Sequence, residues 1–302
     1  MNANKFLSPK NDLAFKRVFG TERNKDILIH FLNDILMRDK LIQKLSFLKT
    51  SQDPEIAPLR VSIVDVLCED ENKDKFVIEM QLSHEKSFER RALYYAARAY
   101  CSQRKKEILY QDLRDVYFLA ITDFAPFPYK KHWLSRLGVK DIDTHEHDIR
   151  ALQLFFLQMP LFKKKKEDLP TMTLPEKWVY YLKYAEQTVE NDLEGIIGKD
   201  QILGRAYEEL NRYAWSEEEL NDYESIEMKQ AADRAVQEAA RDKGREEGEK
   251  IGIAKGEQIG IVKANRELAR RLLQKGVMSL DEVVEVTGLS LDEVKGIEGE
   301  LR

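Results

Sequence analysis

The sequence predicts an α/β domain, with a mixed central sheet flanked by helices, followed by an all-helical C-terminal region. The first observation is the order of hydrophobic patterns, which runs helix, strand, strand, helix, strand, strand. The second is a change of composition after about Ser216, where Pro is absent and Glu, Lys, Ala and Gly dominate. We therefore expect one domain over residues 1–215 and a helical region over 216–302.

Composition supports a folded core and limits how the chain can meet nucleic acid. The 302 residues are 43% hydrophobic and include 13 Phe and 12 Tyr, which is enough apolar material for a real core. The formal net charge is -5. This excludes nucleic-acid binding through bulk positive charge, so any DNA contact must come from a local patch.

The cysteines and the apolar segments indicate the cellular compartment of the protein. Cys68 and Cys101 form no disulfide or metal-ligand framework, and the first ten residues contain no apolar signal segment. The longest apolar runs are far too short for a membrane span. We expect a cytoplasmic protein with no membrane partner.

Individual elements follow from hydrophobic periodicity. A helix is expected over Asp12–Leu36, with one interruption at Gly20-Thr21, and the polar stretch Glu69–Asp74 should connect two strands as a hairpin. The expected strands are 59–67, 75–82, 116–123 and 149–158, and the further expected helices are 86–103, 175–184 and 201–210.

Two acids lie in the first two expected strands. Asp65 lies within Val-Asp-Val, and Glu79 and Gln81 lie within Ile-Glu-Met-Gln. Because strand side chains alternate between faces, Glu79 and Gln81 share a face, and strand pairing would bring Asp65 near Glu79. Two carboxylates with an amide oxygen form the hard oxygen cluster that Mg²⁺ prefers, which suits phosphodiester hydrolysis. From spacing alone, solvent-facing acids on amphipathic strands remain an alternative.

Five glycines recur every four residues in the C-terminal region, at 244, 248, 252, 256 and 260. On a helix this spacing makes a ridge along which two backbones can approach closely; the alternative is a flexible linker. A helix over 264–274 should follow, and Ser279 and Ser290 each open a capping box. We expect a homodimer joined partly through this glycine helix.

Several motifs together resemble a known family. They are the opening segment 11–20, Phe-Val-Ile-Glu-Met-Gln at 76–81, Arg-Ala-Leu-Tyr-Tyr at 91–95 and the glycine-spaced tail. The combination is similar to the Rpn-type recombination-promoting nucleases and transposase-like proteins of the PD-(D/E)XK nuclease superfamily. The resemblance implies a restriction-endonuclease-like core and a metal-dependent DNA endonuclease. It also implies Mg²⁺, or another divalent cation such as Mn²⁺ or Ca²⁺, held by Asp65 and Glu79.

One residue departs from the superfamily pattern. Gln81 stands where the broader superfamily has a Lys that activates the attacking water. Gln carries no charge but can donate and accept hydrogen bonds, so we expect it to position the water, with Lys16 or Arg91 as a compensating cation. The alternative is a catalytically weak or inactive nuclease fold that acts as a DNA- or protein-binding regulator.

Further residues are candidates around this site. Asp12 is either a third acid or an ordinary helix N-cap. Arg91 and Arg98 fall on one helical face with Tyr94 and Tyr95, and with Lys16 they are candidate DNA contacts. The acidic stretch 143–148 contains His145 and His147 at metal-ligand spacing, but a solvated loop is favoured because no third distant ligand is implied.

Overall fold

The computed structural model describes residues 4–49, 51–52, 62–104 and 108–301. The chain divides into two compact units, Met1–Gln230 and Ala231–Arg302. The composition change at Ser216 falls directly before helix α7 (Glu217–Lys275), whose first turns still belong to the first unit. A functional boundary at Ser216 therefore stays a prediction.

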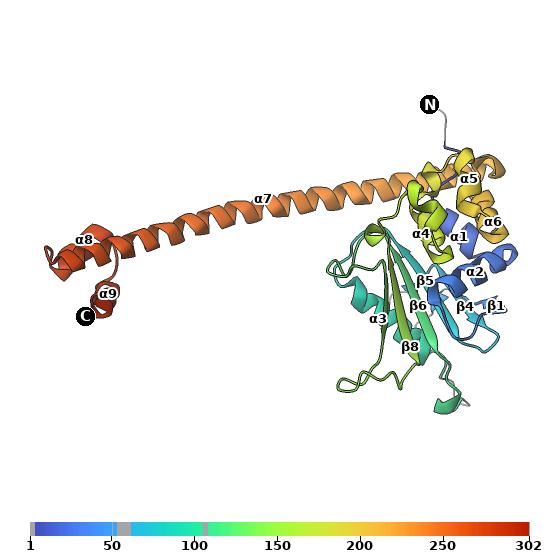
Figure 1. Cartoon of the computed structure of the whole chain (residues 1–302), viewed down its shortest axis with the longest axis horizontal. Helices are drawn as coiled ribbons and strands as arrows, with labels where there is room; N and C mark the ends of the chain where they lie inside the picture. The colour runs from blue at the N-terminus through green and yellow to red at the C-terminus, as the bar shows by residue number, and fades with distance from the viewer. Residues whose placement is uncertain (1–3, 50, 53–61, 105–107, 302) are drawn as a thin grey trace. The chain divides into compact units, whose positions relative to one another are not determined.

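A six-stranded mixed sheet forms the centre of the first unit (Figure 1). Its strands lie in the order β1-β4-β5-β6-β8-β7. They are β1 (Leu45–Phe47), β4 (Val66–Asp70), β5 (Lys75–Gln81), β6 (Val116–Thr122), β7 (Leu134–Gly138) and β8 (Leu152–Gln158). The pairs β5–β6 and β6–β8 are parallel and the others antiparallel. A short separate pair consists of β2 (Ser51–Gln52) and β3 (Ser62–Ile63).

Helices cover both faces of this sheet (Figure 1). One face packs against α1, α2, α4 and α6, and the other against α3. The helices of this unit are α1 (Asp12–Phe19), α2 (Lys25–Leu36), α3 (Phe88–Cys101), α4 (Leu174–Tyr184), α5 (Glu190–Ile197) and α6 (Gln201–Glu209). The arrangement is a restriction-endonuclease-like α/β fold, as the sequence predicts.

Burial on both faces explains the strand sequences. All seven residues of β6 are buried, which is the continuous apolar pattern of a strand inside a parallel sheet. Along β5, Ile78 and Met80 enter the core beneath α1 and α2, while Val77 enters the core beneath α3. Glu79 therefore projects toward α3, into a layer that is otherwise apolar.

The structure differs from the expected elements at several places. The expected break at Gly20-Thr21 is present, and Gly20 ends α1. Of the expected strand 59–67, residues 59–61 lie outside the described residues, and β4 begins only at Val66 and continues to Asp70. The connection to β5 is thus shorter than 69–74. Strands β1 and β7 were not expected, because each is a short edge strand defined mainly by its partner.

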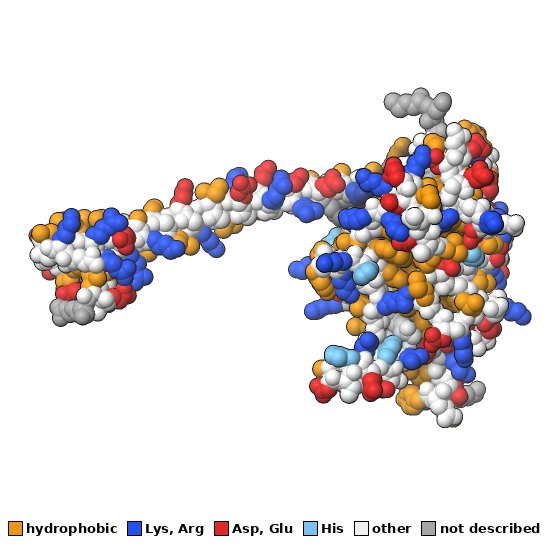
Figure 2. All heavy atoms as spheres, in the orientation of Figure 1, with side chains coloured by type: hydrophobic (Ala, Val, Ile, Leu, Met, Phe, Trp, Pro, Cys, Tyr) orange, Lys and Arg blue, Asp and Glu red, His pale blue; other side chains and the backbone are white. Residues whose placement is uncertain are grey.

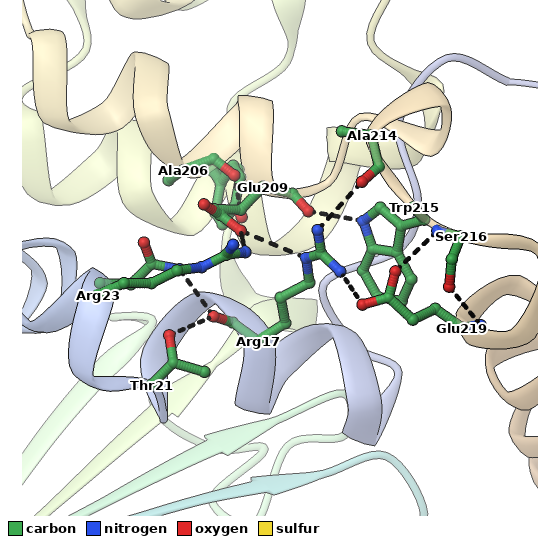
Figure 3. A network of polar contacts seen from close by, with 11 residues as sticks. Arg17, Thr21, Arg23, Ala206, Glu209, Ala214, Trp215, Ser216 and Glu219 are labelled. Carbon is green, nitrogen blue, oxygen red and sulfur yellow. Dashed lines mark hydrogen bonds and ion pairs between the residues drawn. The ribbon is translucent and has the colours of Figure 1, made fainter.

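Arg17 connects α1 with residues 209–219, which lie between α6 and the first turn of α7 (Figure 3). Arg17, on α1, donates to Glu209 at the end of α6, to Glu219 in the first turn of α7 and to the backbone oxygen of Ala214. Its guanidinium also lies 4.4 Å from the ring centroid of Trp215. Because its side chain is only 14% exposed, these contacts are partly shielded from water.

The second unit contains its own small core. The last turns of α7 pack with α8 (Leu280–Thr287) and α9 (Leu291–Leu301) around five buried residues: Ala269, Val283, Leu289, Val294 and Ile297. Both predicted capping boxes form, since Ser279 exchanges hydrogen bonds with Glu282 and Ser290 with Glu293. Gly288 ends α8 at a φ of 65°.

The five spaced glycines lie inside α7, a single helix of 59 residues, so this segment is not a linker and the expected helix over 264–274 is the end of α7. A Cβ added at any of them would meet no atom within 4 Å among the residues that the structure describes. Lys, Arg, Asp and Glu side chains alternate along the helix (Figure 2). Within the described part of the chain, every helix is too short or too polar to span a bilayer.

We predict that Arg17→Ala lowers the free energy of unfolding by about 2 kcal/mol, because it leaves the partly buried Glu209 without this donor. Urea unfolding measures the change. The control is Arg205→Ala, which removes a more exposed ion pair with Asp26 and should cost less than about 1 kcal/mol. Equal losses in the two variants would contradict the structural role of Arg17.

Candidate functional site

Asp65 lies immediately before β4 rather than inside a strand, which corrects the expected position. The antiparallel register pairs Val66 with Ile78, so Asp65 lies opposite Glu79 on the neighbouring strand. The carboxylate of Asp65 accepts a 2.8 Å hydrogen bond from the backbone amide of Met80. This bond fixes the Asp65 side chain at the end of β5 that carries Glu79.

Glu79 is a buried carboxylate with one free oxygen. Its Oε1 accepts a 2.9 Å hydrogen bond from Arg91 on α3, whereas its Oε2 is buried with no hydrogen-bond partner among the described residues. Burial raises the pKa of Glu79 to about 7. The positive charge of Arg91 lowers this pKa, and the negative charge of Asp65 raises it to a smaller extent. An unpaired buried oxygen of this kind is costly unless a donor or a cation reaches it.

Arg91 links the two polar residues of β5. Its Nη2 donates to Glu79 and, at 2.7 Å, to Oε1 of Gln81, while Nη1 pairs with Glu85. The Nε2 of Gln81 donates to the backbone oxygen of Ser83 at 3.1 Å and to Glu85 at 3.2 Å. Sequence reasoning missed Glu85, because it lies in the turn before α3 and off the helical face that carries Arg91.

Two residues of α1 lie near Asp65. Lys16 Nζ is 4.0 Å from Asp65 Oδ1. Burial raises the pKa of Asp65, with a further raising effect from the charge of Asp12 and a lowering effect from Lys16. The reading of Asp12 as the helix N-cap is wrong, because Asn11 caps α1 and Asp12 follows it. The Asp12 carboxylate instead accepts a 3.3 Å hydrogen bond from Gln230.

The other candidates lie further away. Arg98 is in the last turn of α3, seven positions beyond Arg91. Tyr94 is 56% exposed, whereas Tyr95 packs against the core beneath α3. His145 and His147 lie in a surface loop, and the residues that the structure describes contain no group of three His, Cys, Asp or Glu placed to hold a metal ion.

The residues at this site fit a divalent cation. Asp65 and the free Oε2 of Glu79 are hard oxygen donors from neighbouring strands, the type that Mg²⁺ prefers. Two carboxylates account for only part of a coordination shell. Backbone oxygens and water would complete it, as is usual for Mg²⁺.

The fold and the site define a class: a nuclease-like α/β protein with paired acids on neighbouring strands. The chain belongs to the PD-(D/E)XK nuclease family transposases, whose family model matches residues 9–240. The match includes the paired acids, α3 and the first turns of α7. Comparisons with curated proteins and with solved structures gave no match.

We predict a strong energetic coupling between Arg91 and Glu79. Arg91→Met should lower the free energy of unfolding by about 3 kcal/mol, because it leaves a buried carboxylate without its cation. Glu79→Gln alone should cost less, and the double variant should recover much of the loss. Urea unfolding of the wild type, the two single variants and the double variant, all in EDTA, gives the four free energies of this double-mutant cycle. Additive effects of the two substitutions would show that the pair is not coupled.

Proposed function

We propose that this protein is a metal-dependent DNA endonuclease that hydrolyses phosphodiester bonds. The observation that carries the proposal is the meeting of Asp65 and Glu79 at one end of the sheet, with a buried Glu79 oxygen that has no partner. Membership of a nuclease family supports the same reading. The protein's acidic net charge is compatible with it only if DNA meets a local basic surface.

Asp65 and Glu79 would hold a Mg²⁺ or similar divalent ion, and Asp12 is a candidate third acid. When bound, such an ion polarises the scissile phosphate and lowers the pKa of a water. Gln81 would orient the attacking water, since its amide can both donate and accept. Arg91 would supply the positive charge that Gln81 lacks, because it already contacts both Glu79 and Gln81.

DNA would approach along the side of α3 and α1. Lys16 and Arg91 flank the two acids, at 4.0 Å from Asp65 and 2.9 Å from Glu79 respectively, and Arg98 lies further along α3. Cations in these positions can contact phosphates on either side of the cleaved bond. Tyr94, exposed on the same helix, can add a polar or stacking contact.

The decisive experiment is plasmid nicking by the purified protein with Mg²⁺ or Mn²⁺, and with EDTA. We expect cleavage that EDTA abolishes and that Asp65→Ala and Glu79→Ala reduce at least about a hundredfold, because each removes a proposed ligand. The matched control is Asp192→Ala, a partly buried acid on α5 that pairs with Lys166. Undiminished cleavage by Asp65→Ala would reject the site, and no metal-dependent cleavage of any DNA form would reject the activity.

A second candidate function is a DNA- or protein-binding regulator without catalysis. The observation that favours it is the bridging position of Arg91, whose guanidinium contacts Glu79 and Gln81 where a cation would otherwise be needed. Calorimetric titration with Mn²⁺ separates the two. Metal binding that depends on Asp65 supports the nuclease, whereas DNA binding without any metal binding supports the regulator.

We further propose that the protein is a cytosolic homodimer joined partly through α7. Five glycines face open space, and Ile251, Ile253, Ile259 and Ile261 are each more than half exposed. Cleavage of both DNA strands needs two active sites, which a twofold dimer supplies. The free thiols of Cys68 and Cys101 are compatible with a reducing compartment.

We predict that replacing Gly248, Gly252 and Gly256 with Leu shifts the protein from dimer to monomer. A Cβ at these positions would meet no atom within 4 Å in the described part of the chain, and Leu has a higher helix propensity than Gly, so the substitutions should not disrupt α7 itself. The control is the same triple substitution with Ala, which adds less bulk. Sedimentation at micromolar concentration measures the state. A full-length monomer, or a dimer unaffected by Leu, would refute the glycine interface.

A further inference from the structure

A second concave site lies at the opposite end of the sheet from Glu79. A cavity of about 680 Å³ opens where β5, β6 and β8 begin, between the end of α2, strand β7 and the loop that follows it. Asp74, in its wall, is five residues before Glu79, which corresponds to about 16 Å along an extended strand. This cavity is therefore separate from the paired acids, and its volume is typical of small-molecule sites.

The floor of the cavity is rigid. Arg38 lies 4.4 Å from the centroid of the Tyr117 ring and 5.1 Å from that of Phe76, and these two rings stack at 5.2 Å. The Arg38 guanidinium also donates to Asp70 and Asp74. Two acids and two rings thus hold its planar group in place, and the acids balance its charge.

The rim of the cavity is cationic. Arg114, Arg136, Lys140 and Arg150 come from separate segments and are all exposed. Arg150 is 3.8 Å from the exposed Asp39, whereas the other three form no ion pair with any residue that the structure describes. Figure 2 shows Lys, Arg and His side chains interspersed with Asp and Glu at the lower end of the first unit. The lining also includes Asp39, Asp74 and Asp115, and the charges of Arg114 and Arg150 act on Asp115. Six Lys or Arg residues against three Asp leave the lining with an excess of positive charge, which attracts an anion.

Two backbone details indicate a shaped site. Met37, which ends α2, has a φ of 47°, an unfavourable conformation for a residue with a side chain, and it precedes the Arg38 that enters the floor. Gly138, at the end of β7, packs directly against the ring of His147. A Cβ at position 138 would lie only 2.7 Å from Nε2 of His147, so a larger residue would clash. That Nε2 is buried without a hydrogen-bond partner among the described residues.

We propose that this cavity binds a phosphate-bearing nucleotide, either free or at the end of a DNA strand. Phosphates would meet Arg114, Arg136 and Lys140, which offer charged donors at the rim. The apolar part of the ligand would lie against Leu36 and Leu113. A site lined by apolar groups and by an excess of cations over acids suits a ligand with a planar body and several negative charges.

The test is calorimetric titration of the full-length protein with pyrophosphate, ATP and a short 5′-phosphorylated DNA oligonucleotide, in EDTA so that no divalent ion carries phosphate to Asp65 and Glu79. Arg136→Glu should weaken binding roughly tenfold or more. Lys199→Glu makes the same charge change at an exposed position outside the cavity and should have little effect. Arg114→Gln gives a milder rim variant, and thermal unfolding without ligand checks that each variant folds.

Binding of ATP or pyrophosphate that is lost in the rim variants identifies a free nucleotide as the source of the phosphate. Binding of the oligonucleotide alone, with the same losses, identifies a DNA end. No binding of any probe, or equal binding by Arg136→Glu and Lys199→Glu, would overturn the proposal while leaving the nuclease activity of the paired acids untouched.

Discussion

The parallel pairing of β5, β6 and β8, with helices on both faces, constrains everything else in the first unit. A strand in this position has no solvent-facing side, so each of its residues must be apolar or be satisfied by a neighbour. Glu79 interrupts the apolar pattern of β5, and Arg91 on α3 donates a hydrogen bond to its carboxylate. The position of α3 over the sheet therefore depends on polar pairing as well as on apolar burial.

This constraint also concentrates polar chemistry at the two ends of the strands. At one end, Asp65 is fixed by the backbone of Met80 and lies opposite Glu79. At the other, Arg38 is fixed by Asp70 and stacked aromatic rings. Because the middle of the sheet is packed mainly with apolar side chains, the two polar regions are separated by the hydrophobic core.

The sequence predicts the parts of this arrangement that depend on local patterns. The break between α1 and α2 follows from Gly20, and β6 follows from an unbroken apolar run. The shared face of Glu79 and Gln81 follows from strand alternation alone. The approach of Asp65 to Glu79 could likewise be predicted before the strand pairing was known, although Asp65 lies just outside the strand in which it was expected.

The remainder depends on tertiary contacts that no local pattern contains. Strand β7 has few apolar residues and exists because β8 offers it a partner. Asp65 lies just before β4, where its side chain accepts a hydrogen bond from the amide of Met80, fifteen residues further along the chain. The role of Glu85 and the unpaired His147 nitrogen depend on loop conformations, which sequence periodicity does not describe.

The glycines of α7 have a consequence for folding cooperativity. Each exposed glycine costs a helix about 1 kcal/mol relative to alanine, and the five lie within seventeen consecutive residues. Tyr223 packs in the core of the first unit and Ala269 in that of the second, whereas residues 241–264 between them are exposed among the residues that the structure describes. The middle of α7 therefore opens at lower free energy than its ends. We therefore expect unfolding of one compact unit to stop at this segment, so that the two units melt in separate transitions.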